Sequence, residues 1–390
     1  MAHLNPQFEK LPKSYIFPVI EEKLANLHAS EPEAEILNLG VGDVSLPLLP
    51  EIAEAISKAA HEMTHTPRGY GPSEGYSFLR EAICTHEYAE WGLTPEEIFI
   101  SDGTNADASS IGELFSPENI VAIADPTYPV YLDASLIGGK HAILFPTTEA
   151  DGFIPHPPKE RAELVYLCTP CNPTGVALNE AHLAEWIAWA KKNGSLLLID
   201  NVYFPFAQAE NIPSSIYALE GAKDVAIEMR SFSKLAGFTG LRCGYMAIPK
   251  AIFDGKLHQM WARRTAAKSN GVSYPIQRGA EVCFEPAVRA KLKEQIAIYQ
   301  NSARLLRHAL REGDQTFFGG ENSPYIFWKT PEGVSSWEFF DELLETCKIV
   351  AIPGSGFGPC GEGYIRLSCF LPEETATKAA HALHHLFATV

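Results

Sequence analysis

Four short apolar runs decide the fold of this chain: Ile120-Val-Ala-Ile-Ala124, Leu164-Val-Tyr-Leu-Cys168, Ser195-Leu-Leu-Leu-Ile199 and Val225-Ala-Ile-Glu-Met229. They read as buried strands, and a helix-period segment from about Glu180 to Lys192 separates the second from the third. Strands that alternate with helices are typical of a mostly parallel sheet covered on both faces. Active sites in such α/β folds lie beyond the carboxyl ends of the strands, so the residues after each run are the first candidates for function.

The carboxyl-terminal part follows a different pattern. A long, charged, helix-period segment from about Ala287 to Gly313 precedes a strand at 325–328, a helix at 337–346, a strand at 364–368 and a final helix. This order predicts a smaller α+β domain. We expect residues 1–47 to form an amino-terminal segment that contributes to the small domain and the active site. Residues 48–285 would be the large cofactor-binding domain, and residues 286–390 the small domain.

Composition argues against several partners. The chain has 31 Lys and Arg against 48 Asp and Glu, a formal net charge of -17, which repels nucleic acids and anionic lipids. No apolar run approaches the roughly 18 residues of a membrane span, and the amino terminus lacks a signal-peptide layout. The 8 cysteines show no zinc spacing, which favours free thiols and no metal site. We expect a cytoplasmic protein with neither nucleic acid nor membrane as a partner.

The central functional candidate is Lys234, in Ser231-Phe-Ser-Lys234 directly after the fourth run. A lysine on a Ser- and Gly-rich turn is well placed to reach into a cleft and form an imine with an aldehyde cofactor. The serines and the following Arg242 supply donors that suit a phosphate dianion. Taken alone, the segment could also be a solvated basic loop.

Asp200 ends the third run, where a carboxylate is costly to bury unless it has a charged partner. The N–H of a protonated pyridine ring is such a partner, and an acid there keeps the ring able to accept electrons. Tyr203 could hydrogen-bond the ring hydroxyl. In isolation, Asp200 could be a surface acid at a strand end.

Three weaker segments point to the same sheet edge. Asn172-Pro-Thr-Gly175 marks a tight turn after the second run, with its amide toward the cleft. Ser101-Asp-Gly-Thr-Asn-Ala-Asp107 leads into a helix whose backbone could bind a phosphate, and Tyr128 could stack on a cofactor ring. Two further motif matches are rejected. Cys168-Thr-Pro-Cys171 fits the C-x-x-C redox motif but lacks a thioredoxin-like surrounding. Gly356-Phe-Gly-Pro-Cys-Gly361 fits the dinucleotide-binding motif G-x-G-x-x-G, but a strand follows it where that motif needs a helix.

Together these segments resemble class I/II aminotransferases, and within them the LL-diaminopimelate aminotransferase family. The resemblance covers almost the whole chain, and the motifs that carry it are Ser14-Tyr-Ile-Phe-Pro18, Leu39-Gly-Val-Gly-Asp-Val-Ser-Leu-Pro-Leu48, Arg68-Gly-Tyr-Gly-Pro72, Gly237-Phe-Thr-Gly240, Asn270-Gly-Val-Ser-Tyr274, Pro353-Gly-Ser-Gly-Phe-Gly358 and Tyr364-Ile-Arg-Leu-Ser368. It implies a fold-type-I transferase that depends on pyridoxal 5'-phosphate (PLP), with a mostly parallel central sheet flanked by helices and a smaller α+β domain.

The resemblance also implies roles. Lys234 would hold PLP as a Schiff base and move a proton between the substrate Cα and the cofactor, with Asp200 and Tyr203 completing the catalytic group. The other cofactor-binding residues would be Asn172, Tyr128, Ser231, Arg242, Thr104 and Asn105. Arg366 would pair with the substrate α-carboxylate as a bidentate fork. The substrate pocket would be completed by Gly42, Tyr15 and Asn172, with Tyr70 and Asn270 from the partner subunit of a homodimer with shared active sites.

The implied reaction converts tetrahydrodipicolinate and glutamate to LL-diaminopimelate and 2-oxoglutarate. Three departures from the family pattern bear on this substrate: Ser73 stands in place of an acid unless Glu74 substitutes for it, Asn105 stands in place of a lysine, and Ser269 in place of a phenylalanine. They leave open a diverged paralogue that transaminates a neutral, aromatic or lysine-like amino acid. A PLP-dependent lyase or decarboxylase, and a PLP-binding regulator without catalysis, are further alternatives; the acidic balance opposes the regulator.

Overall fold

The computed structural model describes residues 2–11 and 16–388. Its largest element is a seven-stranded sheet in the order β2-β8-β7-β6-β5-β3-β4. The strands are β2 (Ile98–Ser101), β3 (Ile120–Asp125), β4 (His141–Pro146), β5 (Leu164–Cys168), β6 (Leu196–Asp200), β7 (Ala226–Ser231) and β8 (Gly244–Ala247). Strand β8 is antiparallel to both of its neighbours, β2 and β7, and the other pairs in the sheet are parallel. The mostly parallel order brings the carboxyl ends of β5, β6 and β7 to one edge.

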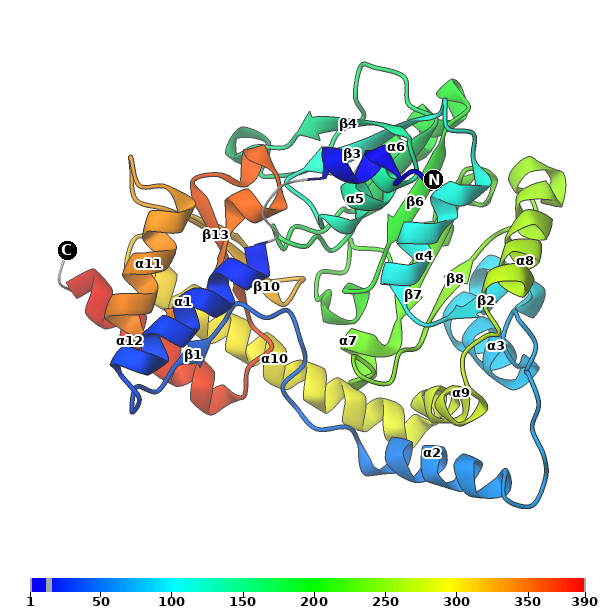
Figure 1. Cartoon of the computed structure of the whole chain (residues 1–390), viewed down its shortest axis with the longest axis horizontal. Coiled ribbons are helices and arrows are strands. Elements are labelled where there is room, and N and C mark those ends of the chain that lie inside the picture. Colours follow the sequence, from blue (N-terminus) through cyan, green and yellow to red (C-terminus); the bar gives the residue numbers. More distant parts are fainter. Residues whose placement is uncertain (1, 12–15, 389–390) are drawn as a thin grey trace.

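Helices surround this sheet (Figure 1). They are α2 (Pro50–Glu62), α3 (Ser77–Ile83), α4 (Thr104–Ser110), α5 (Val130–Ile137), α6 (Glu180–Asn193), α7 (Phe232–Ala236), α8 (Lys256–Lys268) and α9 (Tyr274–Glu281). The burial pattern explains why the sheet must be covered, since every residue of β5, β6 and β7 is buried. A strand that is apolar on both faces is stable only between two helix layers.

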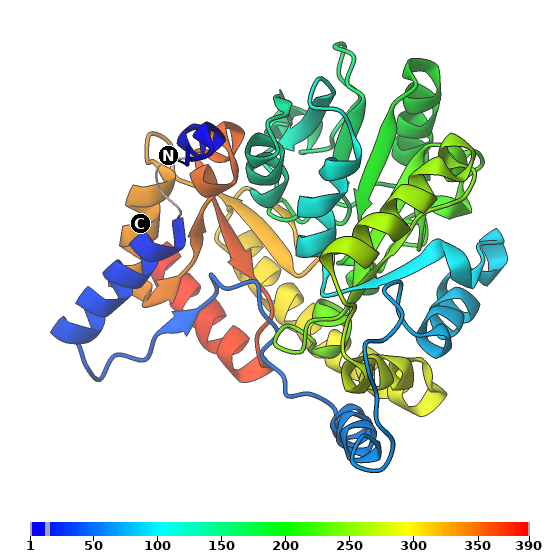
Figure 2. The ribbon, with the colours of Figure 1, turned by 45° about the vertical axis from the view of Figure 1, so that its right-hand side comes forward.

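A second sheet of four antiparallel strands, in the order β12-β13-β10-β9, forms a smaller lobe. Its strands are β9 (Phe317–Gly319), β10 (Tyr325–Lys329), β12 (Ile352–Pro353) and β13 (Tyr364–Ser368), and α11 (Ser336–Cys347) and α12 (Glu373–Ala388) pack with them. Strand β1 (Leu37–Asn38) pairs in parallel with β11 (Ile349–Val350). Helix α1 (Ile16–Ser30) also lies against α11 (Figure 2). Helix α1 and strand β1 therefore pack on this carboxyl-terminal lobe, whereas the short helix η1 (Pro6–Lys10) lies against α5 of the large lobe.

Helix α10 (Pro286–Glu312) connects the two lobes. Its first turns bury Val288 and Leu292 in the core of the large lobe, whereas Leu306 and Leu310 belong to the core of the small one. Figure 1 shows this long yellow helix running beneath both. One continuous helix thus fixes the distance between the sheet edge and the small lobe.

The sequence locates the central strands within one or two residues. The runs at 164–168 and 364–368 coincide with β5 and β13, while β6 and β7 begin one residue later than expected. Strands β2, β4 and β8 were not anticipated, because each is short or lies toward a sheet edge, where the apolar signal is weak. Within the described residues, no helix combines the length and apolarity needed to cross a membrane.

Candidate active site

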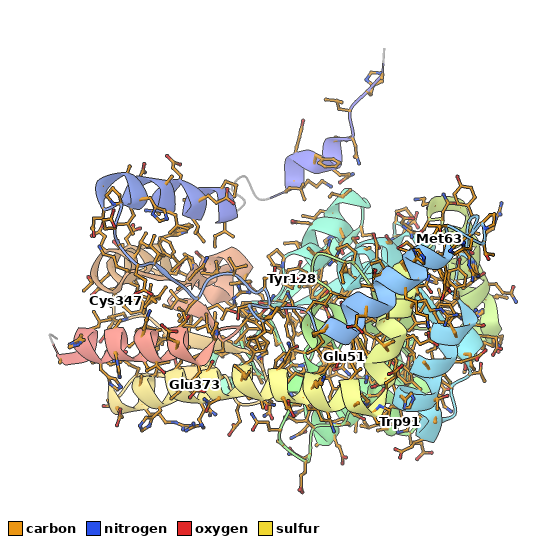
Figure 3. All side chains as sticks on the ribbon, turned by 90° about the horizontal axis from the view of Figure 1, so that it is seen from below. Glu51, Met63, Trp91, Tyr128, Cys347 and Glu373 are labelled. Carbon is orange, nitrogen blue, oxygen red and sulfur yellow. The ribbon has the colours of Figure 1, made fainter. Side chains whose placement is uncertain are left out.

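Residues from both lobes line a cavity of about 360 Å³ at the carboxyl edge of the large sheet. Eleven of the residues singled out in the sequence lie on its wall: Gly42, Thr104, Asn105, Tyr128, Asn172, Asp200, Tyr203, Ser231, Lys234, Arg242 and Arg366. Figure 3 shows Tyr128 where the two lobes meet. The tertiary structure therefore gathers side chains that are spread over more than three hundred residues of sequence.

Lys234 lies in α7, which begins directly after β7, with the Ser231 hydroxyl capping the helix by accepting from the backbone N–H of Ser233 at 3.0 Å. The lysine side chain is 14% exposed. Its Nζ donates to the carbonyl of Gly42 at 2.5 Å and lies 3.8 Å from Oδ1 of Asp43. Burial lowers the pKa of Lys234 to about 8, against the opposing effect of Asp43. Near neutral pH an appreciable fraction of this amine is therefore unprotonated and nucleophilic.

Asp200 is buried at the carboxyl end of β6. The hydroxyl of Tyr131 donates to its Oδ2 at 2.5 Å, and the backbone N–H of Val202 donates to its Oδ1 at 3.3 Å. Burial raises the pKa of Asp200 to about 6. Tyr131 was missed in the sequence; it lies in the first turn of α5, three residues after Tyr128, and the two rings meet edge-on with centroids 5.7 Å apart. A buried carboxylate here suits a cationic ring N–H.

A cluster of donors lies at another side of the cavity. Thr104 begins α4, and its Oγ1 is buried without a hydrogen-bond partner in the structure. Ser233 and Arg242 line the same wall, where Nη1 of Arg242 donates to the carbonyl of Thr239 at 3.0 Å. A Cβ at Gly103 would lie 2.5 Å from Nη2 of Arg242, so glycine is what allows the guanidinium this close. An unpaired hydroxyl beside a guanidinium suits a phosphate.

Arg366 projects from β13 and is 3% exposed. Its Nη1 donates to Oδ1 of Asn172 at 2.7 Å and its Nη2 to the carbonyl of Gly40 at 2.6 Å. The guanidinium lies over the ring of Tyr325 at 4.5 Å, and its buried Nε has no hydrogen-bond partner. Because a guanidinium carries five N–H donors, these contacts orient it and leave donors for a carboxylate.

Tyr325 is a second residue that the sequence did not single out. Its hydroxyl lies 2.9 Å from the hydroxyl of Tyr203, so β10 of the small lobe closes the cavity over the large sheet. A Cβ at Gly42 would clash with the Tyr325 hydroxyl, which explains why this position is glycine. Tyr325 lies inside an apolar run, where a structural role is the ordinary reading, and so the sequence carried no signal for it.

Two expected substrate residues lie outside this cavity. Tyr70 is 88% exposed, and Asn270 is exposed as well. Their loops are neighbours, since a Cβ at Gly271 would lie 3.1 Å from the carbonyl of Pro72. The departures Ser73 and Ser269 belong to these two loops, whereas Asn105 lies in the cavity and accepts from the hydroxyl of Tyr128 at 3.1 Å. Tyr15 is outside the described residues.

Comparison with known proteins identifies aminotransferases as relatives of this chain. The family model of class I and II aminotransferases matches residues 34–383. An LL-diaminopimelate aminotransferase of Agathobacter rectalis is 44% identical over 99% of this chain and 100% of its own length. One of Parabacteroides distasonis is 42% identical over 95% and 96%. The solved L,L-diaminopimelate aminotransferase of Chlamydomonas reinhardtii superposes with a TM-score of 0.93 at 36% identity, covering 99% of both chains. The fold is that of fold-type-I aminotransferases, and this chain is an enzyme that belongs to the class I and II aminotransferase family.

Proposed function

We propose that the enzyme is an LL-diaminopimelate aminotransferase that uses PLP. The reaction would convert tetrahydrodipicolinate and glutamate to LL-diaminopimelate and 2-oxoglutarate, through two half-reactions with ping-pong kinetics. The names of relatives at 42–44% identity over nearly the full length support the substrate. The observation that carries the chemistry is the single cavity that joins a buried amine, a buried carboxylate, a phosphate-suited cluster and a guanidinium.

The residues present fit PLP. The unpaired buried hydroxyl of Thr104 lies where a phosphate would supply its missing partner. Thr104, Ser231 and Arg242 would hold the phosphate, and Lys234 would hold the cofactor covalently. The remaining contacts would come from Asp200 at the ring nitrogen and from Asn105, Tyr128, Asn172 and Tyr203. When bound, PLP supplies an electron sink for the pair that is left when the substrate Cα loses its proton.

The side chains of this protein would then do the following. Arg366 would bind the α-carboxylate, with Asn172 and Gly40 holding its guanidinium in place. Lys234 Nζ would take the proton from the substrate Cα, a task suited to an amine whose pKa burial lowers to about 8. Anchoring the carboxylate in this way favours loss of the Cα proton over decarboxylation. Burial of Asp200 under Tyr131 would keep water from its carboxylate.

A homodimer with shared active sites belongs to the same proposal, as does a cytoplasmic location. Tyr70 and Asn270 would enter the pocket of the partner subunit. Their exposure in a single chain, on two loops that lie side by side, supports this.

The test of the substrate is a donor panel measured in single half-reactions, with LL-diaminopimelate, lysine, glutamate and tyrosine. Lysine is the informative control, because it has the distal ammonium of diaminopimelate without the distal carboxylate. We expect LL-diaminopimelate to exceed lysine in kcat/KM by at least about tenfold. If it reacts no faster than the others, the diverged paralogue favoured by Ser73, Asn105 and Ser269 replaces the proposed substrate, and the transaminase chemistry stands.

A further inference from the structure

A tyrosine that no sequence motif singled out makes the shortest contact to the buried acid of the site. The hydroxyl of Tyr131 donates to Oδ2 of Asp200 at 2.5 Å, and both side chains are buried. Tyr131 comes from α5, and Asp200 from the end of β6. The other donor to this carboxylate is the backbone N–H of Val202, at the longer distance of 3.3 Å.

The position of Tyr131 is fixed from two sides. Its ring stacks on Tyr166 with centroids 4.8 Å apart and planes 8° from parallel. The hydroxyl of Tyr166 is directed elsewhere, to the carbonyl of Ala108 at 2.7 Å. The backbone carbonyl of Tyr131 accepts from the Ser135 hydroxyl at 2.7 Å. A ring held this firmly can set the orientation of the carboxylate that it touches.

The Tyr131 hydroxyl also helps to stabilise the negative charge of the Asp200 carboxylate. Among the described residues, the charge of Asp200 acts to raise the pKa of Asp107 on α4, Cys168 on β5, Cys171 in the turn after β5, and Tyr203 after β6. None of these is a cation. Burial raises the pKa of Tyr131 and Asp200 raises it further, so the phenol keeps its proton and remains a donor. An ionised carboxylate in this site therefore depends on Tyr131 and on the N–H of Val202.

We propose that Tyr131 is a positioning residue, whose hydroxyl holds the Asp200 carboxylate ionised and oriented for the ring nitrogen of the cofactor. This inference rests on the proposed function, since it needs PLP in the cavity. Tyr131 touches neither the substrate nor the reacting atoms in this scheme and acts through Asp200.

The test compares Tyr131→Phe with Tyr166→Phe. Each variant loses one buried phenol hydroxyl and keeps its ring in the stacked pair, but only the first loses the donor to Asp200. The dissociation constant of PLP from the cofactor-free protein is measured by fluorescence titration, and the pH midpoint of the bound-cofactor absorbance by spectrophotometry. Y131F should weaken PLP binding by at least about tenfold and shift the absorbance midpoint away from the wild-type value, whereas Y166F should stay within about twofold of wild-type affinity with an unchanged midpoint.

Each outcome decides something. Equal cofactor affinity and midpoint in Y131F and Y166F overturn the inference, as does a Y131F protein that fails to fold while Y166F folds, because the role is then structural. A second measurement uses Asp200→Asn, in which the charge is absent. Y131F should weaken PLP binding less in that background than in wild type, and an equal effect in both contradicts coupling through the carboxylate. A wild-type protein that does not bind PLP contradicts the proposed function itself and not this inference alone.

Discussion

At the residue scale, burial moves the pKa values of Lys234 and Asp200 in opposite directions, to about 8 and about 6. Desolvation disfavours the charged form of each group, so it lowers the pKa of the amine and raises that of the acid. The lysine gains a neutral, nucleophilic fraction, and the acid becomes costly to keep ionised. Both shifts arise from burial in the folded site and not from the residues that flank Lys234 and Asp200 in sequence.

The first prediction concerns cofactor capture by the cofactor-free protein. Covalent attachment needs the neutral amine of Lys234, so its rate should rise with pH and level off above about 8. The measurement is stopped-flow absorbance after mixing with PLP between about pH 6 and pH 9.5. Lys234→Ala is the control and should show neither covalent attachment nor turnover. A rate that does not change with pH, or attachment in K234A, contradicts the assignment of the lysine.

The second prediction is a conflict between stability and function at Asp200. A folded-state pKa raised above the ordinary value of 3.8 means that ionisation opposes folding, so this cost is absent below about pH 4, grows as pH rises to about 6 and is constant above that. Asp200→Asn should therefore stabilise the cofactor-free protein at pH 8, by roughly 1–3 kcal/mol, while abolishing efficient transamination. Thermal unfolding at pH 4 and pH 8 measures the effect. A D200N protein less stable than wild type at pH 8 would count against it.

At the scale of elements, the turn between β2 and α4 brings Arg242 to the donor cluster. Gly103 has φ 118° and ψ 159°, a conformation that side chains adopt only under strain, and Arg242 fills the space that a Cβ would need. Arg242 follows α7 and is far from Gly103 in sequence, so the close approach depends on the conformation of the β2–α4 turn. The geometry of one glycine thereby controls the phosphate end of the cavity.

The third prediction follows from that turn. Gly103→Ala should lower the free energy of unfolding by about 1–3 kcal/mol and displace Arg242. The preference of the cofactor-free protein for PLP over pyridoxal, which lacks the phosphate, should shrink. Gly240→Ala is a matched control, because a Cβ there meets nothing within 4 Å. Both affinities are measured by fluorescence titration. An unchanged preference in G103A would show that Arg242 does not contribute to phosphate binding.

At the scale of the whole molecule, the two lobes share one long helix and meet around the cavity, yet Tyr70 and Asn270 stay outside it. If the partner subunit supplies these residues, each active site combines Lys234 of one chain with Tyr70 of the other. Defects in the two residues then fall into different sites of a mixed dimer.

The fourth prediction uses this arrangement. Lys234→Ala and Tyr70→Ala homodimers should each be nearly inactive with LL-diaminopimelate. A mixed dimer has one site with both defects and one intact site, so equal mixing with full subunit exchange should restore about one quarter of wild-type activity. Light scattering checks the dimer, and exchange is followed by energy transfer between labelled chains. Complete exchange without recovered activity would place Tyr70 outside the shared site.

The sequence by itself determined the fold class, the central strands and most of the cavity wall. It could do so because periodic apolar runs report burial directly, and because parallel strands carry the residues that follow them to one sheet edge. Lys234 and Asp200 were accessible in this way, since each follows such a run. Tyr131 and Tyr325 could not be predicted in this way, because aromatic residues on a helix or strand ordinarily belong to the hydrophobic core.

Only the tertiary structure decided that these two tyrosines reach Asp200 and Tyr203. It also decided that Gly42 and Gly103 must lack a side chain, because Tyr325 and Arg242 take that space from distant parts of the chain. The physical reason is the same in each case. A hydrogen bond or a steric contact between residues far apart in sequence depends on how the elements pack, and the periodicity of a single element contains no record of its neighbours.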